Sequence, residues 1–190
     1  QAAAQSLGIK TDERKQYKAH TVSNTFEGTL ASKSGCHEVT DTITVYEPQK
    51  DDTQFYVTYD DTQEKSRSLF VEKCLKDKDQ YTVFFGGNHP KITIRTTSES
   101  GRRLLIFKDS YANSFIQFLT PYYEKIILVD PRYYYDNASS IITGEEITDV
   151  LFLYNLNTYL EDNSLADTLD AAQPEQTEGG DTAATNTDQA

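Results

Sequence analysis

The fold is decided by one stretch, LLIFKDSYANSFIQFLTPYYEKIILVDPRYYYD, which spans residues 104–135. Leu104–Phe107 and Lys125–Val129 are short apolar runs of the kind that form strands buried on both faces of a sheet. Between them, apolar residues at helical spacing predict a helix over Ala112–Tyr123, which Pro121 helps to end. Two strands joined by one helix predict a parallel crossover unit, and therefore an α/β fold.

Ser110 follows the first of these strands, on the turn into the predicted helix. Ligands of such sheets gather beyond the carboxyl ends of the strands, and free N–H groups at a helix start favour a developing negative charge. The position therefore suits a serine nucleophile. It also suits a plain cap formed by Asp109 and Ser110, because both residue types are good N-caps. Without further information, the strand-turn-helix pattern favours the helix cap over the nucleophile.

A second feature is the pair of glycines in Gly86-Gly87-Asn88, which follows a predicted strand over Gln80–Phe85. Glycine permits positive φ and a close approach of the backbone to a ligand. Gly87 and Asn88 could supply N–H donors to an oxyanion hole. A simple turn before the next strand explains the same residues, and their spacing alone favours that turn.

The N-terminal half has a different texture, with short β-prone segments separated by Gly, Asp and Asn. Asp41–Tyr46 and Gln54–Tyr59 alternate with period two and predict antiparallel hairpins that flank the main sheet or are inserted into it. A further hairpin is expected between Lys91–Thr96 and Arg102–Phe107, with its turn at Gly101.

The C-terminal part adds three elements. Ser139–Glu146 is expected to form a short helix, Asp149–Tyr154 the last buried strand, and Tyr159–Leu169 a further helical segment.

The ends of the chain indicate a fragment. Gln1–Leu7 is expected to be the end of a helix capped by Gly8, and the chain contains no Met, so we expect a parent protein truncated at its N-terminus. Residues 1–169 are predicted as one domain, with residues 21–80 as its β-rich flank or insertion. Residues 170–190 contain no aromatic or branched aliphatic residue and are expected to be a disordered acidic tail.

Bulk properties narrow the function. The net charge of −12 argues against nucleic-acid binding, which needs a basic surface. Cys36 and Cys74 could form one disulfide, although two unpaired thiols are favoured. His20, His37 and His89 are too scattered to predict a metal site, so neither a metal nor another cofactor is expected.

Several segments together resemble the DHHW family of SGNH-type hydrolases, bacterial cell-surface proteins that are similar to alginate O-acetylation proteins. KDSYANSF (residues 108–115), continued by FLTPYYEKIILVDPRYY (118–134), is similar to the block around the family's nucleophile. The same order of matching segments includes TVSNTFEGTLASKSG (21–35), FFGGNHP (84–90) and ITDVLFLYN (147–155). The resemblance covers most of residues 1–165.

The resemblance implies an SGNH-hydrolase-like (flavodoxin-like) three-layer sandwich with a parallel central sheet. It implies Ser110 as the catalytic nucleophile and favours Gly87 and Asn88 as oxyanion donors. Tyr111, Arg132 and Asn155 are the candidate substrate-binding residues. Arg132 could bind an anionic group, although an ion pair to a neighbouring aspartate is the favoured role.

The implied activity is that of a serine esterase or O-acetyltransferase acting on cell-surface polysaccharide through an acyl-Ser110 intermediate. The expected partners are that polysaccharide and a membrane-bound O-acyltransferase, in the bacterial cell envelope or outside the cell, with a signal or anchor upstream. The chain has no Trp and no Asp-His-His-Trp, the motif that supplies the family's base, so we expect it to be nearly inert. Lys108 also stands where other SGNH branches have Gly. The alternative is a non-catalytic surface module that binds glycan or protein.

Overall fold

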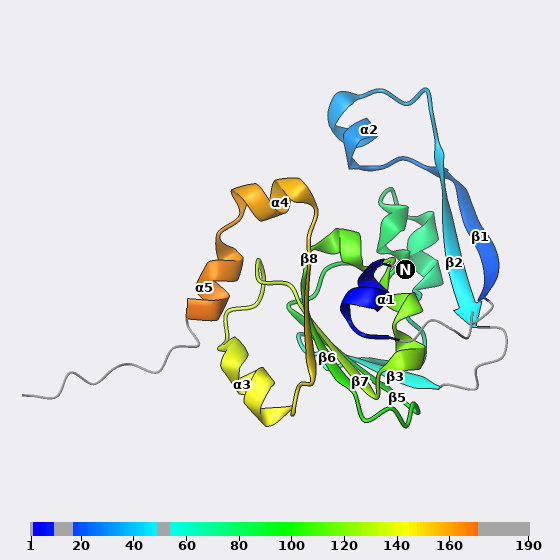
Figure 1. The fold of residues 1–190 in the computed structure, drawn as a ribbon. Helices are drawn as coiled ribbons and strands as arrows, with labels where there is room; N and C mark the ends of the chain where they lie inside the picture. The colour runs from blue at the N-terminus through cyan, green and yellow to red at the C-terminus, as the bar shows by residue number, and fades with distance from the viewer. Residues whose placement is uncertain (1, 10–16, 49–53, 171–190) are drawn as a thin grey trace, which may run out of the picture.

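Two β-sheets organise the computed structural model, which describes residues 2–9, 17–48 and 54–170 (Figure 1). The strands are β1 Tyr17–Phe26, β2 Asp41–Pro48, β3 Phe55–Tyr59, β4 Lys65–Ser66, β5 Lys91–Thr96, β6 Arg103–Lys108, β7 Lys125–Val129 and β8 Asp149–Leu153. The α-helices are α1 Ala2–Ser6, α2 Thr29–Ser34, α3 Ala138–Gly144, α4 Leu156–Glu161 and α5 Ser164–Asp170. The 3₁₀ helices are η1 Glu72–Lys76, η2 Gln80–Val83, η3 Ser110–Ala112, η4 Ile116–Phe118 and η5 Thr120–Tyr122.

The main sheet is mixed, with the strand order β4-β3-β5-β7-β6-β8. β6 pairs in parallel with β7 and β8, which confirms the crossover unit, whereas β3, β4 and β5 add antiparallel pairs. The predicted parallel sheet therefore holds for β6, β7 and β8 only, and antiparallel strands of the kind expected at its flank, β3 and β4, belong to the same sheet together with β5. The predicted hairpin of β5 with β6 is also wrong, because β7 lies between them. β6 is buried on both faces and takes a parallel neighbour on each side, while β5 is buried at alternate residues.

The segment between β6 and β7 is not the continuous α-helix that the spacing predicts. It forms three short 3₁₀ turns, η3 to η5. Gln117 Nε2 donates to the carbonyl of Ser114 at 2.5 Å, and Thr120 Oγ1 donates to the carbonyl of Gln117 at 3.3 Å. Such side-chain bonds take up carbonyls that an α-helix would use, and Pro121 lacks an N–H.

The predicted strand over Gln80–Phe85 is likewise wrong, because its first four residues form η2. Asp79 begins this turn: its carboxylate accepts from the Tyr81 N–H, and its carbonyl accepts from Thr82 Oγ1 at 2.5 Å. Local bonding outcompetes the β-propensity of these residues, and only the isolated bridge Phe70–Phe84 remains.

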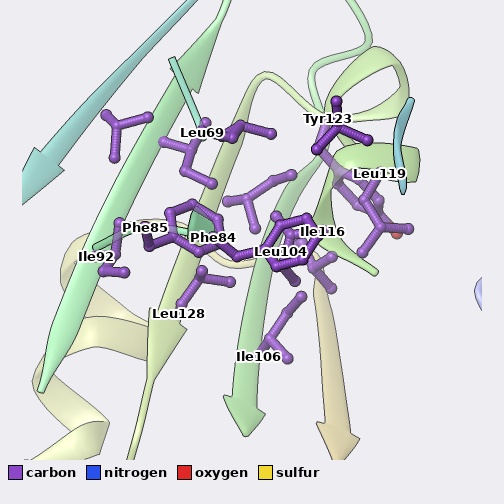
Figure 2. Close-up of a cluster of buried hydrophobic side chains, with 14 of the residues drawn as sticks. Leu69, Phe84, Phe85, Ile92, Leu104, Ile106, Ile116, Leu119, Tyr123 and Leu128 are labelled. Atoms are coloured by element: carbon purple, nitrogen blue, oxygen red, sulfur yellow. The ribbon is translucent and has the colours of Figure 1, made fainter. Parts of the chain in front are cut away.

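The larger core cluster lies on one face of the main sheet (Figure 2). There Phe84 and Phe85, which follow η2, pack among residues of the sheet and of the 3₁₀ segment, including Leu104, Leu128 and Ile116. The other face carries a smaller cluster in which Leu105, Phe107, Ile127 and Val129 pack against residues of α3 and its preceding loop. Both faces of β6 and β7 are thus covered, as their apolar sequences require.

β8 was predicted as a buried strand, but it forms the edge of the sheet. Val150 and Phe152 are 42% and 50% exposed on the side where Phe107 stacks on Phe152. A single strand partner leaves such an edge strand only half covered.

β1 and β2 form a separate antiparallel hairpin, as the alternation of β2 predicts, with α2 at its tip. The arm is tied to the main body through Ser23 Oγ, which donates to Gln80 Oε1 at 2.5 Å, and through the Tyr46 N–H, which donates to Gln117 Oε1 at 2.7 Å. Figure 1 shows its tip at the end of the molecule where β8 leads into α4.

The remaining elements follow the sequence more closely. α1 ends before Gly8, whose φ is +62°, and α3 lies in the predicted place, whereas the last helical segment is split into α4 and α5. Cys36 is free and exposed, and Cys74 is free and buried. None of the helices in the described ranges is long and apolar enough to cross a bilayer. The predicted tail falls outside the described residues, apart from its first residue.

Candidate active site

Ser110 stands directly after the carboxyl end of β6, as the first residue of η3. The cap of this turn is Asp109, which is fully buried and extended (φ −105°, ψ −172°). Its carboxylate accepts from the N–H groups of Tyr111 (3.0 Å) and Asn155 (2.9 Å), and from Asn155 Nδ2. The capping role that the sequence leaves open between the two residues belongs to Asp109. The Ser110 hydroxyl makes no hydrogen bond to any described residue.

A cavity of about 360 Å³ opens beside Ser110, and we call it the serine cavity. Its walls come from the tip of the β1–β2 arm, from η2 and the glycine turn, and from η3 with the residues after it. The lining residues are Phe26, Gly28, Thr29, Asp79, Tyr81, Thr82, Gly87, Asn88, Ser110, Tyr111, Asn113 and Ser114. Ser110, Gly87 and Asn88, which are far apart in sequence, therefore line the same space.

The glycine turn is held in an unusual backbone conformation. Phe85, Gly86 and Gly87 have φ values of +65°, +81° and +125° in succession, and the Phe85 side chain is buried in the core. A non-glycine residue at positive φ costs on the order of 1 kcal/mol, and such strain gathers at functional sites. The Gly87 N–H makes only a long hydrogen bond, 3.4 Å, to the carbonyl of Phe84. The Asn88 side chain is exposed and has no hydrogen-bond partner among the described residues. Both groups retain donors to offer to a ligand.

Asn113 is a cavity residue that the sequence analysis missed. It is 3% exposed, and its Oδ1 is buried without a hydrogen-bond partner in the described chain. Side chains at i and i+3 eclipse one another in a 3₁₀ helix, so the position three residues after Ser110 was a usable signal. An unpaired carboxamide beside a cavity is costly unless a ligand or water satisfies it.

Four charged side chains cluster at the carboxyl ends of β6 and β7. Asp130 is fully buried and receives Nε and Nη2 of Arg132 at 2.8 and 2.7 Å. This bond raises the pKa of Arg132 further. Lys108 is also fully buried, with Nζ 3.8 Å from Asp130 Oδ2 and no hydrogen bond, and burial lowers its pKa to about 8. Together with Asp109, the cluster contains two cations, Lys108 and Arg132, and two anions.

The three candidate substrate-binding residues lie together around a second hollow of about 640 Å³, which shares Ser110 with the serine cavity. Tyr111 is 65% exposed. Arg132 lines the hollow while bound to Asp130, which is the ion pair that the sequence favoured. The Asn155 carboxamide is already engaged, because Nδ2 donates to Asp109 and Oδ1 accepts from the Thr158 N–H at 3.0 Å.

Among the described residues, no histidine lies beside Ser110 to act as its general base. The three histidines each lie near a carboxylate: His20 near Glu47 (3.5 Å), His37 near Glu27 (2.6 Å) and His89 near Asp61 (2.9 Å). His89 also contacts the carbonyl of Phe85 at 3.1 Å, so its local pairing agrees with the expectation. No histidine lines the serine cavity as described. Within the described ranges, no three His, Cys, Asp or Glu residues could jointly hold a metal ion.

Fold and site together define an α/β protein that presents a serine, a strained glycine turn and two asparagines at the carboxyl edge of a mixed sheet. The crystal structure of a DHHW family protein from Eubacterium siraeum is similar to this chain, with 28% identity and a TM-score of 0.75. The match covers 88% of this chain and 58% of that one. No family model and no curated protein matches the sequence.

PatB1 of Bacillus cereus has a similar fold. Its structure with a sulfonyl adduct matches at 19% identity and a TM-score of 0.58, and a second PatB1 structure at 18% and 0.57. Each match covers 75% of this chain, but 47% and 50% of PatB1. The chain thus spans less than two thirds of the length of these solved structures.

Proposed function

We propose that this chain carries the nucleophile half of an SGNH-type serine esterase or O-acetyltransferase that acts on cell-surface polysaccharide. The observation that carries the proposal is the unpaired Ser110 hydroxyl in one cavity with Gly87 and Asn88. The structural likeness to a DHHW family protein supports it. We extend the proposal to a place at the bacterial cell surface and to a membrane-bound O-acyltransferase as the partner that delivers acetyl groups, as the sequence resemblance implies.

In this mechanism, Ser110 Oγ attacks the carbonyl carbon of an acetyl ester while a base accepts the hydroxyl proton. Negative charge develops on the carbonyl oxygen, where the Gly87 N–H and the Asn88 amide would stabilise it. The tetrahedral intermediate collapses, the C–O bond to the leaving group breaks, and the departing oxygen takes up the proton. Water or a sugar hydroxyl then removes the acetyl group from Ser110, which makes the protein an esterase or a transferase respectively.

No histidine of the described chain lines the serine cavity, and the one lining carboxylate, Asp79, already caps η2, so the proposal takes the base to be a histidine from outside the cavity. This leads to a rescue experiment: free imidazole can act as the missing base. We expect the chain alone to hydrolyse 4-nitrophenyl acetate at the rate of Ser110→Ala, and imidazole to raise the rate of the wild type above that of the variant. The comparison is made at each imidazole concentration, since imidazole itself cleaves the ester.

Ser114→Ala is the matched control, because Ser114 lines the same cavity and its variant should be rescued like the wild type. Equal rates of wild type and Ser110→Ala at every imidazole concentration would end the esterase proposal. Ser110-dependent hydrolysis at an ordinary esterase rate without imidazole would instead show that a base is present.

The second candidate function is a non-catalytic module that binds glycan or protein. It is favoured by one observation, the exposure of Tyr111 beside a serine that lacks a base. Failure of the rescue experiment, with retained glycan binding, would select this function.

A further inference from the structure

The hollows along the carboxyl edge of the sheet are neighbours that share lining residues. The serine cavity and the second hollow share Thr29, Ser110 and Tyr111. The second hollow shares Arg132 with a third, of about 160 Å³, whose wall includes Tyr135 and Asp167. The three hollows therefore lie side by side from the tip of the β1–β2 arm to α5, and we treat this row of hollows as one groove.

Ser110 lies at the boundary of two of these hollows, because it lines both the serine cavity and the second hollow. A site for a drug-sized ligand measures about 300–1,000 Å³, and the first two hollows (about 360 and 640 Å³) already reach that upper limit. A small ester or the end of a chain would fill only one side. A groove open on both sides of the reacting residue suits an internal unit of a long chain.

The charge of the groove selects the kind of chain. Its lining contains two cations, Lys33 and Arg132, and Arg132 is already neutralised by Asp130. It contains five carboxylates: Asp79, Asp136, Glu161, Asp162 and Asp167. A polyanion would meet net repulsion along the whole groove, and the chain as a whole carries −12.

Two tyrosines provide exposed aromatic surface along the groove. Tyr111, at the boundary of the first two hollows, is 65% exposed, and Tyr135, in the third, is 87% exposed. An aromatic ring offers an apolar face together with a polar tip, which matches the mixed surface of a sugar ring.

From these observations we infer that the groove binds an internal stretch of a polysaccharide without negative charge, and not a polyuronate. This inference rests on the proposed function in taking a glycan as the ligand. It goes beyond that function by naming the charge class of the glycan and the direction in which it crosses the site.

The test is native affinity electrophoresis of the full chain at low ionic strength. Gels contain hydroxyethylcellulose, dextran or glycol chitin as neutral polymers, and alginate as the polyanion. We expect at least one neutral polymer to retard the protein and alginate to leave it unretarded. Tyr111→Ala and Tyr135→Ala should each weaken retardation by about three- to tenfold. Tyr159→Ala is the matched control, because Tyr159 is also 65% exposed but lines none of the hollows.

Stronger retardation by alginate, no retardation by any neutral polymer, or equal losses in all three tyrosine variants would each overturn the inference. The imidazole experiment keeps the two proposals apart. Ser110-dependent hydrolysis without neutral-polymer binding removes this inference alone, and polymer binding without Ser110-dependent hydrolysis removes the esterase alone.

Discussion

Replacing Lys108 with Met should stabilise the protein, although it deletes a charged residue beside the candidate nucleophile. The Lys108 side chain is fully buried, and Nζ has no hydrogen bond. Burial lowers its pKa from 10.5 to about 8. This difference corresponds to about 3 kcal/mol by which the folded protein disfavours the charged amine. Met has a similar length and no charge, and Asp130 keeps its two bonds to Arg132.

We therefore expect Lys108→Met to raise the free energy of unfolding by about 1–3 kcal/mol at pH 7, measured by urea denaturation. The pH dependence follows from the lowered pKa. Between pH 8 and 10.5 the unfolded chain binds more protons at this lysine than the folded one does, so wild-type stability gains from rising pH in that window. The advantage of the variant should shrink across the same window and vanish near pH 10.5.

Subtracting the stability–pH profile of the wild type from that of Lys108→Met cancels the contributions of groups that titrate alike in both proteins. Burial raises the pKa values of Tyr59 and Tyr123 to about 12, which lowers the stability of both proteins as pH rises above 10. Lys125→Met is the control that should lower rather than raise stability, because Lys125 pairs with Glu145 and lowers the pKa of Glu145. It should cost up to about 1 kcal/mol. A less stable Lys108→Met at pH 7, or an advantage constant from pH 8 to 10.5, would refute this account of the buried amine.

Three further changes test the site by urea denaturation. Gly87→Ala should lower the free energy of unfolding by about 1–3 kcal/mol, because the φ of Gly87 is +125°. The control Gly144→Ala, in α3 where φ is ordinary, should be neutral or slightly stabilising. Equal effects of the two variants would contradict the strain argued for the glycine turn. Asp109→Ala should lower the free energy of unfolding by about 3 kcal/mol, because it leaves two N–H groups without an acceptor. The control Asn137→Ala, at the exposed cap of α3, should cost about 1 kcal/mol. A cost near 1 kcal/mol for both would mean that the burial of Asp109 does not increase the cost of losing the cap. Asn113→Leu should be neutral or stabilise by about 1 kcal/mol because its Oδ1 is unpaired, and a loss above 2 kcal/mol would reveal an unseen partner.

The sequence predicts best those parts of the fold in which the residue type permits a single kind of surrounding. β6 and β7 are apolar at nearly every position, and such runs fit only a doubly covered strand. The parallel crossover between them, and the placing of a serine at its turn, follow from that pattern. Gly8 likewise ends α1 because a left-handed residue is needed there.

The errors arise where local bonds or distant partners decide. Gln80–Phe85 has strong β-propensity, but the bonds around Asp79 wind it into η2. The position of β7 between β5 and β6 depends on pairing across the sheet, which no local pattern encodes. The part of the site that was missed, Asn113, lies in a segment predicted as a regular helix. The helix prediction there rested on the apolar residues alone and did not use the position of Asn113 three residues after Ser110.

The strand order also sets the sequence in which the molecule can assemble. β5 and β6 follow one another along the chain, yet each keeps an open flank until β7 is available to lie between them. β7 ends at Val129, and it is the strand that fills the gap between β5 and β6. The turn that presents Ser110 is therefore flanked by a complete sheet only after β7 has paired. Pairings that bridge intervening chain in this way slow folding. We therefore expect the serine turn to become ordered late in folding, after β7 has completed the centre of the sheet.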